Sequence, residues 1–105
     1  MIDKEQILRK IKKSVTESDP DATLILYGSY ARGDYNEDSD IDLLILINKD
    51  KVNRDDKIHI TYPLYDIQFQ TGVMISARVY SRKFWQNPPF VTPFYENVTR
   101  EGVLL

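Results

Sequence analysis

One apolar run of the sequence contains two carboxylates, and this combination limits what the chain can fold into. The letters from Asp40 to Ile47 read DIDLLILI, so Asp40 and Asp42 are separated by one apolar residue. Side chains alternate along a β-strand, so we expect both carboxylates to project from one face while Ile41 and Leu43 point into a core. Neighbouring carboxylates repel each other unless a cation lies between them. Oxygen ligands suit Mg²⁺ or Mn²⁺, so the pair predicts a divalent metal site.

A second apolar run ends in a turn that is suited to phosphate. Residues 24–27 are followed directly by Gly28 and Ser29. Glycine permits a sharp turn and lets a ligand approach the backbone. Ser29 can cap a helix that begins at Tyr30, where free N–H groups attract anions, and Arg32 adds a cation suited to forked contacts with phosphate. The sequence therefore predicts that Gly28, Ser29 and Arg32 bind a triphosphate beside the aspartate pair.

The acidic loop between the two runs, DYNEDSD, has two simpler explanations. A calcium loop of the EF-hand type needs Gly at its sixth position and Glu at its twelfth. Counting from Asp34, those positions hold Ser39 and Ile45, so this explanation fails. A solvated turn accounts well for Asp34, Glu37 and Asp38. It does not account for two carboxylates inside a strand.

These motifs together resemble a known family. The order is an apolar strand, Gly-Ser, ten intervening residues and then Asp-apolar-Asp-apolar, written here as GSYARG and SDIDLLIL. This pattern resembles the nucleotidyltransferases of the polymerase-beta superfamily, in particular the minimal nucleotidyltransferase domains of prokaryotes. The motif covers under a quarter of the chain, and the length, the first helix and the closing NVTREGVLL also look like this group. The resemblance implies an α+β fold with a small mixed sheet of about three strands flanked by helices.

The resemblance also implies a reaction. In the superfamily an Asp pair and a third carboxylate on a neighbouring strand hold two divalent ions, and a nucleoside monophosphate moves to a hydroxyl group. Asp40 and Asp42 would then be catalytic residues and ligands of Mg²⁺ or Mn²⁺. Gly28 and Ser29 would form the phosphate cradle, and Arg32 would assist electrostatically. The implied enzyme transfers AMP from ATP to a protein or another acceptor.

The third carboxylate is the point at which the chain departs from the family. We expect the third strand at residues 73–81, which contain Ser76 and Arg78 but no acid. Asp66 is the only acid in the segment before that strand, so it is the candidate third catalytic carboxylate. It can serve only if residues 64–69 form a strand or if a helix there leans toward the metals. A second class of function therefore stays open, a catalytically weak or inactive module that acts by binding a partner.

A protein partner is expected under either hypothesis. Minimal nucleotidyltransferases that resemble this chain are often paired with a small helical HEPN protein, as antitoxin to toxin. A domain of this size has little room to recognise an acceptor by itself. Phe84, Trp85, Phe90 and Phe94 predict an aromatic surface that such a partner, or a second copy of the chain, would cover.

The remaining segments predict helices around the strands. Residues 3–17 form an amphipathic helix with Asp3 and Gln6 placed for a capping box. Residues 84–94 are rich in proline and aromatic side chains, which predicts an irregular segment before a final short helix. The apolar letters of residues 58–70 recur at helical spacing, whereas Pro63 would kink a helix and the β-branched and aromatic content favours a strand. We favour a helix that is distorted near Pro63 and ended by Gly72.

Composition narrows the class of protein. The 105 residues are 42% hydrophobic and 29% charged, which is typical of one soluble domain over residues 1–105. The net charge of −2 and the lack of a basic stripe argue against a nucleic-acid groove. No apolar run is long enough to cross a membrane, and the N-terminus is charged from Asp3 onward, unlike a secretory signal. The lack of cysteine fits a reducing cytoplasm.

Overall fold

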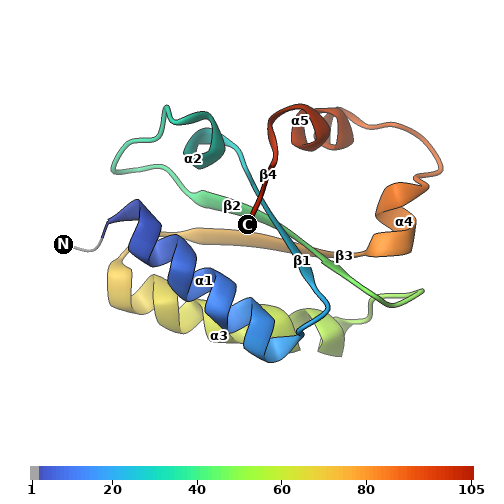
Figure 1. The fold of residues 1–105 in the computed structure, drawn as a ribbon, viewed down its shortest axis with the longest axis horizontal. Coiled ribbons are helices and arrows are strands. Elements are labelled where there is room, and N and C mark those ends of the chain that lie inside the picture. Colours follow the sequence, from blue (N-terminus) through green and yellow to red (C-terminus); the bar gives the residue numbers. More distant parts are fainter. Residues whose placement is uncertain (1–2) are drawn as a thin grey trace.

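Strand β2 (Ile41–Ile47) lies inside a mixed sheet of four strands, in the order β3-β2-β1-β4 (Figure 1). The computed structural model describes residues 3–105. β1 (Thr23–Tyr27) runs antiparallel to β2, and β3 (Ile75–Ser81) runs parallel to it. β4 (Val103–Leu104) adds an antiparallel pair at the outer edge of β1. The predicted α+β class is confirmed. The fourth strand was not expected, because two residues are too few to show a periodic pattern.

Helices α1 (Lys4–Ser18) and α3 (Arg54–Thr71) cover one face of the sheet (Figure 1). The capping box predicted at the start of α1 is present, with Asp3 accepting from the Gln6 N–H at 2.9 Å. An aliphatic core fills the space between these helices and the strands. Its buried members include Ile7, Ile11 and Val15 of α1, Ile60, Leu64 and Ile67 of α3, and Ile41, Leu43, Ile45 and Ile47 of β2.

α3 confirms the helix that was favoured for the ambiguous segment. The helix begins four residues before Ile58, and Asn53 caps its N-terminus in a capping box with Asp56. It ends at Gly72, which has a left-handed φ of 74°. Pro63 lies inside the helix. The apolar letters that indicated the helix, Ile58, Tyr62, Tyr65 and Phe69, are all exposed. The stripe predicted the right element, yet it lies on the side of the helix away from the core.

The opposite face of the sheet carries α4 (Arg82–Gln86) and α5 (Pro93–Glu101), with an aromatic cluster beneath them. Trp85 and Phe94 lie 5.8 Å apart between ring centroids, and Tyr27 lies 5.4 Å from Phe94. The expectation that residues 84–94 are irregular throughout was wrong at their start, because the Ser81 hydroxyl caps α4. Trp85 and Phe94 are packed in the cluster, whereas Phe84 and Phe90 are exposed.

Within residues 3–105, no helix combines the length and the apolar character that a membrane crossing requires.

Candidate active site

The turn after β1 places the backbone against a carboxylate. Tyr27, the last residue of β1, pairs with Asp42 of β2. Gly28 follows with φ 75°, a left-handed value that favours glycine, and leads into α2 (Ser29–Arg32). A Cβ atom added to Gly28 would lie 2.3 Å from Asp42 Oδ2. The turn and the aspartate therefore meet with no room for a side chain between them.

Ser29 does not have the capping role that the sequence predicted. Gly28 is the N-cap of α2, Ser29 is its first helical residue, and no side chain makes the capping hydrogen bond. The helix is a single turn, held by the Ala31 and Arg32 N–H groups donating to the Gly28 carbonyl. Gly33 then ends it in the left-handed conformation, with φ 87°. The structure thus brings Gly28 and Arg32 together within one turn of chain.

The two aspartates lie at the start of β2. The strand begins at Ile41, so Asp40 precedes it directly instead of lying within it, which corrects the expected boundary. The Ile41 N–H donates to the Met74 carbonyl at 2.9 Å and fixes this end of the strand. Asp40 is exposed and Asp42 is half-buried. Burial raises the pKa of Asp42, and the charge of Asp40 raises it further. The two carboxylates are therefore electrostatically coupled.

Glu101, at the end of α5, also reaches this site, although no motif of the sequence predicts it there. Its Oε1 accepts from the Gly28 N–H at 3.1 Å. Arg32 Nη1 donates to both carboxylate oxygens of Glu101 at 3.2 Å. Hydrogen bonds to Asp34 and then to Glu101 raise the pKa of Arg32. No local pattern could have indicated this contact, because 73 residues separate Gly28 from Glu101.

β3 places a cation close to the aspartates. Ser76 is the register partner of Asp42, and Arg78 pairs with Leu44 on the same face of the sheet. The guanidinium carbon of Arg78 lies 4.5 Å from the centroid of the Phe94 ring. The charges of Arg32 and Arg78 oppose the rise in the pKa of Asp42. This face of β3 therefore carries an arginine and no acid.

The structure keeps Asp66 away from the aspartate pair. Asp66 is exposed on α3, which packs on the face opposite to the one that carries Asp42 and Arg78. Among residues 3–105, no group of three or more acidic, histidine or cysteine side chains is arranged to hold a metal ion. The site therefore offers two aspartates with Glu101 nearby, and Asp66 is not part of it.

These groups fit a hard divalent cation. Asp40 and Asp42 supply only oxygen donors, and Gly28 leaves the space beside Asp42 Oδ2 free of side-chain atoms. Mg²⁺ is commonly bound by one or two carboxylates, with water and substrate phosphate completing its six ligands. Asp40 and Asp42 would hold such an ion.

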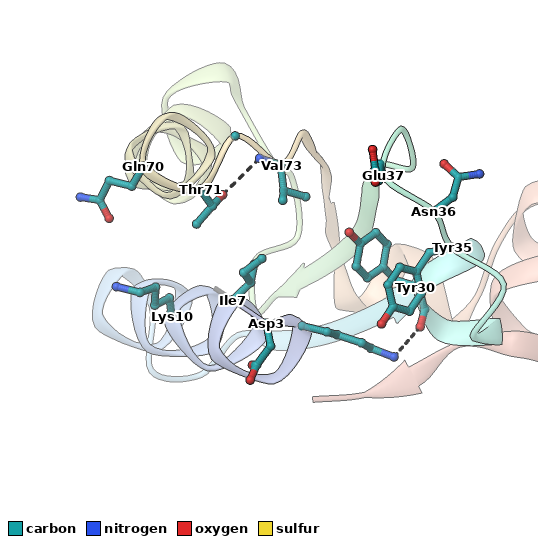
Figure 2. A pocket seen from close by; sticks show the side chains of 12 residues that line it. Asp3, Ile7, Lys10, Tyr30, Tyr35, Asn36, Glu37, Gln70, Thr71 and Val73 are labelled. Atoms are coloured by element: carbon teal, nitrogen blue, oxygen red, sulfur yellow. Dashed lines mark hydrogen bonds between the residues drawn. The ribbon is translucent and has the colours of Figure 1, made fainter. Parts of the chain in front are cut away.

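A pocket of about 830 Å³ opens between α1, the end of α3 and the loop that follows α2 (Figure 2). Its walls come from the start of α1, the loop at residues 35–37 and the end of α3. The rings of Tyr30 and Tyr35 stack with centroids 4.2 Å apart, and Lys4 donates to the Tyr30 carbonyl at 2.8 Å (Figure 2). None of the predicted site residues lines this pocket. Tyr30 thus packs toward α1, while Arg32, two residues later, bonds to α5.

A family model described as a nucleotidyltransferase domain matches residues 8–88. The chain belongs to this family. It is 32% identical over 101 residues to a Methanocaldococcus jannaschii protein named "Putative protein adenylyltransferase MJ0141", covering 93% of this chain and 94% of the relative. The predicted family and the predicted enzyme class, nucleotidyltransferase, are both confirmed.

Solved structures share the fold. A toxin-antitoxin crystal structure with AMP-PNP matches with a TM-score of 0.65 at 20% identity, covering 91% of this chain and 69% of the other. A complex of a tri-AMPylated Shewanella oneidensis HEPN toxin with its MNT antitoxin matches with a TM-score of 0.60 at 16% identity, covering 95% and 69%. At these identities the matches establish a common fold.

Proposed function

We propose that this nucleotidyltransferase moves AMP from ATP to a hydroxyl group of a protein, with a divalent metal ion held by Asp40 and Asp42. The observation that carries the proposal is the direct contact of the Gly28 turn with the Asp42 carboxylate. A phosphate seated at the turn would lie beside the metal-binding oxygens. The name of the relative, the AMP-PNP complex and the AMPylated toxin support AMP as the transferred group.

The residues of the site have separate tasks in this reaction. Gly28 carries no side chain that would block phosphate, and its backbone N–H, bonded to Glu101 in this structure, is the donor that a phosphate would use. Ser29 follows it at the start of α2. Arg32 adds a fixed cation for phosphate oxygens. A bound divalent ion would neutralise charge on the triphosphate and on the leaving pyrophosphate. The oxygen of the acceptor hydroxyl forms a bond to the α-phosphorus and releases its proton to water. The bond from the α-phosphorus to the bridging oxygen breaks, and pyrophosphate leaves with that oxygen.

A binding module is the second candidate function. The observation that favours it is Arg78 on β3, on the strand where the family resemblance implies a third carboxylate. Without that acid, a site can bind nucleotide and still activate the acceptor hydroxyl poorly. Such a protein would act on its partner through a stable complex.

We infer that a helical protein of the HEPN class is the partner in either case. The HEPN complex of a structural neighbour supports this. The exposed stripe on α3, formed by Ile58, Tyr62, Tyr65 and Phe69, supports it independently. Its spacing of four, three and four residues is the spacing of a seam between two packed helices. Phe69 is 92% exposed, so the stripe has no cover within the described chain.

Label transfer tests the enzymatic proposal. The protein is purified with its co-expressed helical partner and incubated with α-labelled ATP and Mg²⁺. We expect label on the partner with wild type and none with Asp42→Asn. Asp21→Asn is the matched control, an exposed aspartate that precedes β1 at the end of the strand away from Gly28, and it should retain transfer. A stable complex that takes up no label from wild type would favour the binding module.

A further inference from the structure

Glu101 makes the contacts that a bound phosphate would make. Its carboxylate accepts from the Gly28 N–H at 3.1 Å and from Arg32 Nη1 at 3.2 Å. A phosphate group also presents anionic oxygens, and it binds the same kinds of donor, a backbone N–H and a guanidinium group. The turn and Arg32 are therefore already bound by an anion of the chain itself.

The position of Glu101 is fixed by the packing around Gly102. A Cβ atom at Gly102 would lie 2.5 Å from the Val98 carbonyl oxygen and 2.9 Å from Ile25 Cγ2. α5 therefore ends in close contact with β1, and only 17% of the Glu101 side chain is exposed. The contact with Arg32 is thus a built feature, unlike a chance pairing of two mobile surface side chains.

The chain beyond Glu101 is held by a short edge strand and by Leu105, which packs against the aliphatic core. β4 has two residues, Val103 and Leu104, and both are exposed. The Leu105 N–H donates to the Leu24 carbonyl at 2.9 Å and extends the pairing by one bond. So short an edge strand makes few hydrogen bonds and buries little apolar surface, and such segments open at low free-energy cost.

The Glu101 carboxylate and the phosphates of a nucleotide are both negatively charged and would repel each other at this site. Arg32 already bonds to Asp34 and acts electrostatically on Asp42, and a triphosphate adds several negative charges to the same region. The Gly28 N–H is a single donor, so Glu101 and a phosphate oxygen compete for it, and the two anions repel each other at this range. Arg32 already donates through Nε to Asp34 and through Nη1 to Glu101, so a phosphate at the turn would compete with Glu101 for Nη1.

We propose that Glu101 is an internal competitor of the nucleotide's phosphate for the Gly28 N–H and Arg32, so that ATP binds only when the Glu101 side chain leaves. This proposal rests on the proposed function in taking Gly28 and Arg32 as the phosphate-binding groups. It adds a regulatory contact, because anything that moves the end of α5 or detaches β4 also opens the nucleotide site. Docking of a protein partner on that edge would be coupled to ATP affinity.

Anion binding tests the competition without requiring enzymatic activity. The affinity of inorganic tripolyphosphate, and separately of ATP with Mg²⁺, is measured by calorimetry for wild type, Glu101→Gln and Glu96→Gln. Glu96 is the matched control, an exposed glutamate on the same helix. We expect Glu101→Gln to bind both ligands about tenfold more tightly than wild type, the equivalent of about 1.4 kcal/mol, and Glu96→Gln to bind as wild type does.

The possible results separate the two proposals. Tighter binding by Glu101→Gln supports the competition even if no label transfer is ever detected, in which case only the enzymatic proposal fails. Equal affinity in wild type and Glu101→Gln, or no tripolyphosphate binding to either, overturns the competition. Weaker binding of ATP with Mg²⁺, together with reduced Mn²⁺ affinity in Glu101→Gln, would also overturn it and make Glu101 a metal ligand.

A second measurement uses wild type alone, in case Glu101→Gln does not fold. Carbon NMR of the glutamate carboxyl groups is recorded while tripolyphosphate is added. The Glu101 resonance should shift toward that of a solvated glutamate, and the Glu96 resonance should stay. An unmoved Glu101 resonance at saturating tripolyphosphate contradicts the competition.

Discussion

The two faces of the sheet differ in what they contain, although the same strands build both. The face under α1 and α3 is aliphatic and closed. The face under α5 changes along its length, from an aromatic cluster around Trp85 and Phe94 to the charged site around Asp42 and Glu101. β2 contributes to both, with Leu43 and Ile45 on the closed face and Asp42 on the other.

This division shows how a small domain can combine stability with a charged site. Because side chains alternate along β2, a slip by one residue would move Asp42 into the aliphatic core and expose Ile41 and Leu43. The cost of that exchange fixes the register of β2, and the register fixes where Asp42 meets Gly28. The closed face therefore positions the site without touching a ligand.

Substitutions on both faces of β2 should separate what each face contributes. On the face under α5, which we call the open face, we expect Asp42→Asn to lower the rate of AMP transfer by on the order of a hundredfold or more. The substitution removes a metal-binding carboxylate. Thermal melting should show a fold at least as stable as wild type at neutral pH. A variant that transfers AMP at the wild-type rate would show that Asp42 is not a ligand.

On the closed face, the largest effect should be on stability. Leu43→Ala removes a fully buried side chain and should lower the free energy of unfolding by about 2–5 kcal/mol, measured by urea denaturation. Val103→Ala, at an exposed position of β4, is the control and should change it far less. ATP affinity of the folded Leu43→Ala protein should stay close to that of wild type. A strong loss of affinity there would mean that the two faces are not independent.

Metal binding should stabilise the folded protein through the carboxylates of the open face alone. Mg²⁺ that binds only the folded state adds about 2.7 kcal/mol at a concentration one hundred times its Kd. We expect the melting temperature of wild type to rise with Mg²⁺ and that of Asp42→Asn to stay constant. Asp66→Asn, which leaves the site intact, should respond as wild type does. No rise in wild type would contradict a metal site at the aspartate pair.

The smallest expected effect is a pH dependence of stability. Burial, and then the charge of Asp40, raises the pKa of Asp42 in the folded protein above its unfolded value. The folded state therefore binds this proton more tightly, so the contribution of Asp42 to stability is complete below the unfolded pKa and is lost as pH rises through the folded pKa. Melting of wild type and Asp42→Asn without metal across this window measures the effect, because acids that do not interact with Asp42 cancel in the difference. Parallel melting curves would contradict the raised pKa.

Local patterns in the sequence determined the parts of the fold and site that depend on neighbouring residues. The capping box at Asp3, the left-handed end of α3 at Gly72 and the turn at Gly28 were all predicted, because each is decided by a few consecutive residues. The alternation in β2 likewise predicted that Asp42 and Leu43 point to opposite faces. The order of these motifs was enough to indicate the family.

Packing between distant segments decided the rest. Only the tertiary structure placed Glu101 on Arg32 and Asp66 on the far side of the sheet, and only it turned the aromatic stripe of α3 outward. Helical spacing shows that an apolar stripe exists. α3 has two apolar sides, and the side with Ile60, Leu64 and Ile67 packs against the sheet, which leaves the aromatic side exposed. The hydrogen bond between Gly28 and Glu101 joins residues 73 positions apart, so no local pattern predicts it. It depends on the pairing of β1 with β4, which follows directly after α5 in the chain.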